Sequence, residues 1–232
     1  MKKLLRLGTR FLGLWAIIAF SMIPSGATSL KVMNLEDLVG NSQRIFSAVC
    51  QSVSSGFDEN NLPYTRYSFR VTDSIHGVAN QQIVVIKQFG LSEPIQLGNG
   101  VTRVSRIEGM PGYVPGQEYL LFLNQESRLG FSSPIGLIQG AFRVRGQGSS
   151  RTVINGLRNA NLLIDTRKSI QQRYRERQQN LSRSAPVSLP DEVVRGPVSY
   201  DNLTRLVRGL VAGEPLDRPA ASRLLGRREG QR

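Results

Sequence analysis

The ten residues Tyr64–Asp73, with the sequence YTRYSFRVTD, alternate between two kinds of side chain. One set of alternate positions carries side chains suited to a buried face, namely Thr65, Tyr67, Phe69 and Val71. The other set is polar or charged, namely Arg66, Ser68, Arg70 and Thr72. Because successive side chains of a β-strand point to opposite faces, this pattern predicts a half-buried antiparallel strand.

Other segments on both sides of this stretch also have the character of strands. They are rich in β-branched and apolar residues and cover 44–54, 83–86, 118–123, 136–138, 141–144 and 152–154. Asn99-Gly100 lies between two short runs of this kind, which is a strong hairpin signal. The sequence therefore predicts a mainly β fold, either a small antiparallel barrel, closed or nearly closed, or a small sandwich.

Two helices are expected beside the strands. Asn34 precedes a short helix that begins at Leu35, and Ser199 caps a second helix that begins at Tyr200. One face of the second helix is apolar and needs a surface to cover it; it consists of Leu203, Leu206, Val207, Leu210 and Val211. The predicted division is a signal peptide at 1–29, a β domain at 30–155, a polar basic linker at 156–197, the amphipathic helix at 198–213 and a disordered basic tail at 214–232.

The first 29 residues have the three parts of a secretory signal peptide. A basic start, Met1–Arg10, is followed by the apolar run Phe11–Ile23, which is short for a membrane-spanning helix. Cleavage after Ala27 and cleavage after Ser29 both leave small residues at the expected positions. We therefore expect an exported protein that is periplasmic, envelope-associated or secreted, with a retained anchor as the alternative.

The positive charge is not spread evenly along the chain. The formal net charge of +13 divides into +4 for residues 1–29, +1 for 30–150 and +8 for 151–232. The predicted β domain is thus almost neutral, and the excess of arginine lies in the C-terminal part. Nucleic acid is not an expected partner, because export removes the usual target and no aromatic residues interleave the arginines.

The layout of residues 35–144 resembles a group of uncharacterised exported bacterial proteins, some of them encoded near matrixin-type zinc proteases. The resemblance rests on the strand order and on the segments IFSAV (45–49), GMP (109–111), PGQEYLLFL (115–123) and GLIQGAF (136–142). The strand order also resembles, more distantly, the oligonucleotide/oligosaccharide-binding (OB) barrel of tissue inhibitors of metalloproteinases and netrin-like modules. These resemblances imply an OB-like barrel and a role near a secreted metalloprotease. In the inhibitors an N-terminal cysteine reaches the protease zinc, and this chain has no cysteine near Thr28 or Leu30.

The sequence lacks the residues of the common catalytic and metal sites. His76 is the single histidine and Cys50 the single cysteine, so histidine-rich zinc sites and intrachain disulfides are excluded. Motifs of serine hydrolases and P-loop enzymes do not occur. We expect His76 to lie in an exposed turn and Cys50 to be a buried strand residue, and we predict no catalytic residues, no cofactor and no metal site.

Two features remain as candidate binding sites. The first is the Gly- and Pro-rich loop that carries Met110, Tyr113 and Val114, where apolar side chains on a constrained loop favour protein binding. The second is the basic segment with Arg173, Arg175 and Arg177, which suits anionic envelope polymers or lipid headgroups.

The resulting prediction is an exported, non-enzymatic module that binds an extracytoplasmic protein. A regulator or inhibitor of a secreted metalloprotease is one alternative, and it predicts contact between the 110–115 loop and the protease. A binder of anionic lipid or polysaccharide is another, and it predicts salt-sensitive binding that is lost on truncation after Asp165. The oligomeric state is left open.

Overall fold

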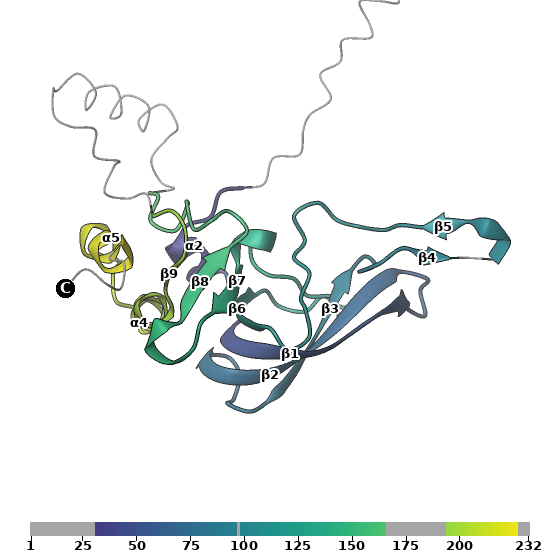
Figure 1. The fold of residues 1–232 in the computed structure, drawn as a ribbon, viewed down its shortest axis with the longest axis horizontal. Helices are drawn as coiled ribbons and strands as arrows, with labels where there is room; N and C mark the ends of the chain where they lie inside the picture. The colour runs from purple at the N-terminus through teal and green to yellow at the C-terminus, as the bar shows by residue number, and fades with distance from the viewer. Residues whose placement is uncertain (1–30, 97, 166–193, 227–232) are drawn as a thin grey trace, which may run out of the picture. The chain divides into compact units, whose positions relative to one another are not determined.

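The computed structural model describes residues 31–96, 98–165 and 194–226. One antiparallel sheet of seven strands, in the order β3-β2-β1-β6-β7-β8-β9, organises this part of the chain (Figure 1). Its strands are β1 (Arg44–Phe57), β2 (Pro63–His76), β3 (Ile83–Phe89), β6 (Glu118–Leu123), β7 (Ala141–Arg145), β8 (Thr152–Asn155) and β9 (Val198–Ser199). A separate hairpin of β4 (Ile95–Gln96) and β5 (Thr102–Arg103), joined through the 3-10 turn η1 (Gly98–Gly100), extends away from the main sheet.

The mainly β, antiparallel class predicted from the sequence is confirmed. The end strands of the sheet, β3 and β9, do not pair with each other, so the sheet is open and the described residues form no closed barrel. The alternation in β2 is also confirmed. Its buried positions are those expected, Thr65, Tyr67, Phe69 and Val71.

The two central strands, β1 and β6, are buried on both faces. Ile45, Leu120 and Phe122 belong to one hydrophobic cluster, whereas Phe46 and Leu121 belong to the other. Helices cover the first cluster: α2 (Leu35–Gly40), α4 (Tyr200–Val211) and α5 (Arg218–Gly226). The second cluster is covered by the loop before β6, which contributes Tyr113. The chain thus has a helical layer on one face of the sheet and a loop layer on the other.

Both predicted helices form, with the predicted caps. The Asn34 side chain accepts from the Asp37 amide, and the Asp37 carboxylate accepts from the Asn34 amide, which is a complete capping box. The Ser199 side chain accepts from the Asn202 amide at the start of α4. Leu203 and Val207 on the apolar face of α4 are buried against the sheet, so the partner surface that this helix needs is its own domain.

One predicted strand is absent. Residues 136–138 were expected to be extended, but Leu137–Gln139 form the 3-10 turn η2. Gly136 and Leu137 have φ values of 60° and 57°, which lie in the left-handed region and end any extended run. Just beyond, Gly140 packs so closely on the chain that a Cβ there would lie 2.3 Å from the carbonyl oxygen of Ile135.

The predicted domain boundary at residue 155 is also too early. Residues 156–163 form consecutive turns in which Leu162 and Leu163 are buried in the first cluster. The buried Asn159 side chain donates to the carbonyl oxygens of Val153 and Gly196, each at 2.9 Å. These turns therefore belong to the folded domain and not to a linker.

The expected disordered tail is wrong for residues 218–226, which form α5. Ala221 and Leu225 are buried in the first cluster, and Arg218 forms an ion pair with Glu36 of α2. The few apolar residues of this polar segment suffice because α4 and β9 provide the surface that they cover. The predicted signal peptide and most of the predicted linker lie outside the described residues.

Candidate functional site

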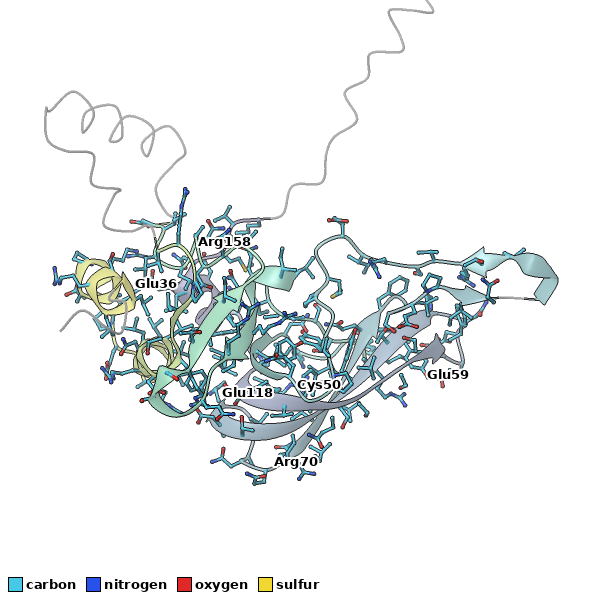
Figure 2. The ribbon with its side chains drawn as sticks, viewed as in Figure 1. Glu36, Cys50, Glu59, Arg70, Glu118 and Arg158 are labelled. Carbon is cyan, nitrogen blue, oxygen red and sulfur yellow. The ribbon has the colours of Figure 1, made fainter. Side chains whose placement is uncertain are left out.

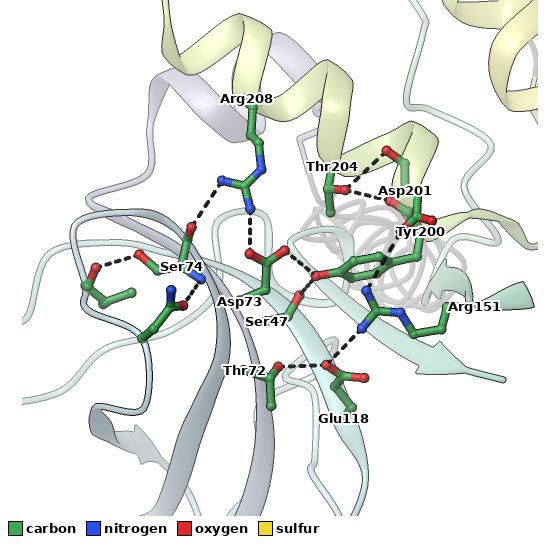
Figure 3. A network of polar contacts seen from close by, with 12 residues as sticks. Ser47, Thr72, Asp73, Ser74, Glu118, Arg151, Tyr200, Asp201, Thr204 and Arg208 are labelled. Atoms are coloured by element: carbon green, nitrogen blue, oxygen red, sulfur yellow. Dashed lines mark hydrogen bonds and ion pairs between the residues drawn. The ribbon is translucent and has the colours of Figure 1, made fainter. Parts of the chain in front are cut away.

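A network of polar contacts lies between α4 and the sheet (Figure 3). The Tyr200 hydroxyl is 2.7 Å from a carboxylate oxygen of Asp73 and 2.8 Å from the Ser47 hydroxyl. Because a carboxylate only accepts, the phenol donates to Asp73 and accepts from Ser47. Arg208, two turns further along α4, pairs with the other oxygen of Asp73 and donates to the Ser74 carbonyl oxygen at 3.1 Å. These contacts attach both ends of α4 to β1 and β2.

A second set of contacts continues the network toward β8. The Arg151 guanidinium lies over the Tyr200 ring, 3.7 Å from its centroid, and 3.6 Å from a Glu118 carboxylate oxygen. The same Glu118 oxygen accepts from the Thr72 hydroxyl at 2.7 Å. Residues from β2, β6 and α4 thus meet Arg151, which directly precedes β8, in one group of alternating charge.

The network resembles a catalytic group in composition but not in access. Ser47 is fully buried and Tyr200 is 1% exposed, so no substrate reaches the hydroxyl groups. Burial also raises the pKa of Tyr200 far above its usual value of 10.0, because the charged phenolate is poorly solvated there. The phenol is therefore a neutral donor, and the network holds the helical layer on the sheet.

The single cysteine lies where the sequence predicts, and the single histidine is exposed as predicted but belongs to strand β2 and not to a turn. Cys50 is a buried strand residue, and burial raises the pKa of its thiol. His76 is exposed at the last position of β2. In the described ranges no group of three or more His, Cys, Asp or Glu side chains is placed to hold a metal ion. No helix there has the length and apolar character needed to cross a membrane.

The predicted binding loop folds back onto the second cluster. Tyr113, expected as an exposed contact, is 5% exposed and packs edge-on against Tyr67, Phe69 and Tyr119. Burial holds its pKa well above the usual value. Val114 is 56% exposed, and its amide donates to the Tyr119 hydroxyl at 3.1 Å. Tyr113 therefore anchors the loop, and Val114 is its exposed apolar residue.

Met110 is half-buried and lines a pocket of about 360 Å³ between this loop and the ends of β2 and β3. The floor includes Tyr67 and Gln88, and Arg106 lies at the rim. The buried Gln88 amide makes one long side-chain hydrogen bond, 3.4 Å to the Tyr113 hydroxyl. The volume is in the range of small-ligand sites, but the lining specifies no particular ligand class.

A third surface, which the sequence analysis did not identify, lies on the outer side of β2 and β3. The pairing of the two strands places Tyr64 opposite Phe89, Arg66 opposite Lys87, and Arg70 opposite Ile83. We call this surface the β2–β3 outer face; it consists of Tyr64, Arg66, Ser68, Arg70, Ile83, Val85, Lys87 and Phe89. By register it continues the side of β1 and β6 that the helices cover, because Arg70 pairs with Val49 and Val71 with Ala48. None of the helices among the described residues extends over it.

The β2–β3 outer face is apolar and basic at once. Ile83, Val85 and Phe89 are 47%, 46% and 38% exposed. Arg66 and Lys87 lie directly across from each other, and like charges in such a cross-strand pair repel each other and are destabilising. Figure 2 shows Arg70 extending away from the sheet.

One of the three cations on this face is neutralised within the domain. The Lys87 ammonium is 2.7 Å from a carboxylate oxygen of Asp58 and lies over the ring of Phe131 at 4.2 Å. Lys87 holds the pKa of Asp58 below its usual value of 3.8. Arg66 lies over the Tyr64 ring at 5.2 Å, but neither Arg66 nor Arg70 forms an ion pair with a described residue.

The remaining predicted site residues, Arg173, Arg175 and Arg177, lie outside the described residues. Comparisons with protein-family models, with curated proteins and with solved structures each found no match to this chain. The feature that best combines exposure, charge and apolar area is the β2–β3 outer face.

Proposed function

We propose that this chain is an exported, non-enzymatic module that binds another extracytoplasmic protein through the β2–β3 outer face. The observation that carries the proposal is an uncovered stretch of sheet on which exposed Ile83, Val85 and Phe89 lie beside Arg66 and Arg70. Exposed apolar groups of this kind, bordered by polar residues, are typical of interaction surfaces. Aromatic residues and arginine are the side chains enriched at the centres of protein interfaces.

The charge of the face indicates the chemistry of the partner. Two arginines that form no ion pair with a described residue add a local positive potential next to apolar side chains. A partner that presents acidic residues around an apolar patch would neutralise both arginines and cover the patch. Export is proposed from the N-terminal sequence. An exported chain would meet its partner outside the cytoplasm, so the proposed partner is an extracytoplasmic protein.

The test is a capture experiment with paired variants. The chain from Leu30 to Arg232 is immobilised and exposed to the culture supernatant and the envelope extract of the cells that produce it. Arg66→Glu with Arg70→Glu reverses the charge of the face. Arg143→Glu with Arg145→Glu makes the same change of charge at two exposed arginines of β7 and serves as the control.

We expect one protein to be retained by the wild type and by the β7 variant, and to be lost or greatly reduced with the face variant. If that protein is a zinc protease, an inhibition assay then decides whether the chain regulates it. Equal capture by both double variants, or retention of only anionic lipid or polysaccharide that elutes with salt, would contradict the proposal.

A further inference from the structure

Strand β3 is the last strand at one end of the sheet, so one of its two edges has no neighbouring strand among the described residues. The Gly90 amide donates to Pro63, and the Val71 amide donates to Gln82, each at 2.9 Å. Because backbone groups alternate along an antiparallel strand, the even-numbered residues of this stretch face β2 and the odd-numbered residues face outward. The N–H and C=O groups of Ile83 and Val85 therefore point to the free edge, where no described residue bonds to them.

This part of the edge has none of the usual features that prevent strand pairing. Natural edge strands are commonly interrupted by charges, prolines or bulges. The four residues Ile83–Ile86 contain no charge and no proline, and their pairing with β2 is regular. The side chains of Ile83 and Val85, which lie on the β2–β3 outer face, are also about half exposed.

The neighbouring residue of this edge, Lys87, already pairs with the backbone of another segment. The Ser132 amide donates to the Lys87 carbonyl oxygen at 2.9 Å, and Phe131 pairs with Lys87 in a parallel bridge. This pairing involves a single residue of β3 and does not extend to Val85. The free stretch therefore runs from Ile83 to Val85.

We propose that β3 accepts an extended segment of the partner protein as an additional strand, hydrogen-bonded to Ile83 and Val85. In strand addition the main chain gives affinity, and alternate side chains give specificity. The segment would carry apolar side chains at the alternate positions that lie against Ile83 and Val85. It would carry acidic side chains near the basic row of the face. The inference rests on the proposed function and specifies how the partner is held.

The charges favour a partner with acidic residues over a second copy of this chain. A second copy paired through β3 would bring its own Arg66 and Arg70 to the same interface, where no described residue neutralises them. An acidic and apolar segment removes that repulsion and covers the two exposed β-branched side chains. We therefore assign the edge to a different protein.

The test uses a displayed library of random twelve-residue peptides, selected on the wild-type chain. Val85→Pro removes one outward N–H that the pairing with β2 does not use, and edge strands tolerate proline at such positions. Val85→Thr is the matched control, because it keeps the N–H and the β-branched shape. Circular dichroism and thermal unfolding establish that both variants are folded.

We expect the selected peptides to alternate apolar with acidic residues. We also expect their affinity to fall at least about tenfold with Val85→Pro and less than about threefold with Val85→Thr. As a second measurement, on the wild-type chain, a saturating peptide should slow hydrogen exchange at the Ile83 and Val85 amides at least about tenfold. The exchange measurement applies even if Val85→Pro does not fold.

Equal affinity for Val85→Pro and Val85→Thr, together with unchanged exchange at the two amides, would overturn strand addition. The proposed function would stand in that case if the peptides still lost affinity for the Arg66→Glu, Arg70→Glu variant. A library that yields no peptide for the wild type would also overturn strand addition, and the capture experiment would then decide the proposed function alone.

Discussion

Replacing Tyr200 with phenylalanine tests whether the polar network holds α4 on the sheet. The change deletes one oxygen and leaves the ring that Arg151 covers. Two hydrogen bonds are lost, one that the hydroxyl donates to the Asp73 carboxylate at 2.7 Å and one that it accepts from the Ser47 hydroxyl at 2.8 Å. Ser47 is fully buried, so its hydroxyl loses a partner without gaining water.

The expected loss follows from these two bonds. A hydrogen bond to a charged group contributes about 1.5–3 kcal/mol, and a neutral one about 1 kcal/mol. Asp73 is partly exposed and keeps Arg208, which lowers the cost on that side. We therefore expect the free energy of unfolding to fall by about 2–4 kcal/mol.

Urea denaturation followed by far-ultraviolet circular dichroism measures this loss. The single tryptophan, Trp15, lies in the predicted signal peptide, so tryptophan fluorescence does not report on the mature chain. Tyr64→Phe is the control, because its hydroxyl makes no hydrogen bond with a described residue. The control should change stability by less than about 0.5 kcal/mol. If Tyr200→Phe were as mild as Tyr64→Phe, the network would not be what holds α4.

The same variant predicts a change at alkaline pH. Burial raises the folded pKa of Tyr200, so its contribution is fully present below the usual value of 10.0 and is lost as the pH rises above it. Tyr200→Phe should therefore show a shallower loss of stability above pH 10 than the wild type. Buried Tyr113 remains in both proteins and should leave part of the slope.

Three further predictions follow from particular contacts. Gly140→Ala places a Cβ against a backbone carbonyl and should lower the free energy of unfolding by about 1–3 kcal/mol. Gly40→Ala is the control; its Cβ would have nothing within 4 Å, so this change should be neutral or slightly stabilising. Chemical denaturation of both variants measures the difference, and equal effects would contradict the close approach at Gly140. Asp58→Asn removes the ion pair between Lys87 and the Asp58 carboxylate, whose pKa is lowered in the folded protein. The wild type should therefore be more stable than the variant at pH 7, and this difference in stability should shrink as the pH falls below about 4. A difference that stays constant down to pH 2 would argue against the ion pair. A chain that ends at Asp165 lacks α4, α5 and β9 and should show no cooperative thermal unfolding. A chain that ends with α5 should unfold as the full chain does. Cooperative unfolding of the shorter chain would mean that α4 is not part of the core.

Local patterns in the sequence were sufficient where they alone determine the structure. The alternation of β2, the caps at Asn34 and Ser199, and the Asn99-Gly100 hairpin were all predicted from neighbouring residues. The left-handed Leu137 was missed, because nothing in an apolar tripeptide distinguishes a 3-10 turn from a strand. For α5 the deciding factor was tertiary, since this polar segment becomes helical where α4 and β9 provide a surface.

The candidate site was harder to predict for a related reason. The alternation of Ile83, Val85, Lys87 and Phe89 is visible in the sequence and indicates an outward face. That β3 lies at the end of the sheet and that its face stays uncovered depend on strand order, which is set by contacts between distant segments. The exposed loop residues chosen from the sequence included Tyr113, whose ring proved to be an anchor because aromatic partners lie beneath it.

The most direct test of the account is the affinity of the captured protein for the two charge-reversed variants, measured by calorimetry at the same ionic strength. We expect binding at least about tenfold weaker for Arg66→Glu with Arg70→Glu, a loss of about 1.4 kcal/mol or more, and binding within about twofold of wild type for Arg143→Glu with Arg145→Glu. Equal affinities for the two variants would contradict binding through the β2–β3 outer face.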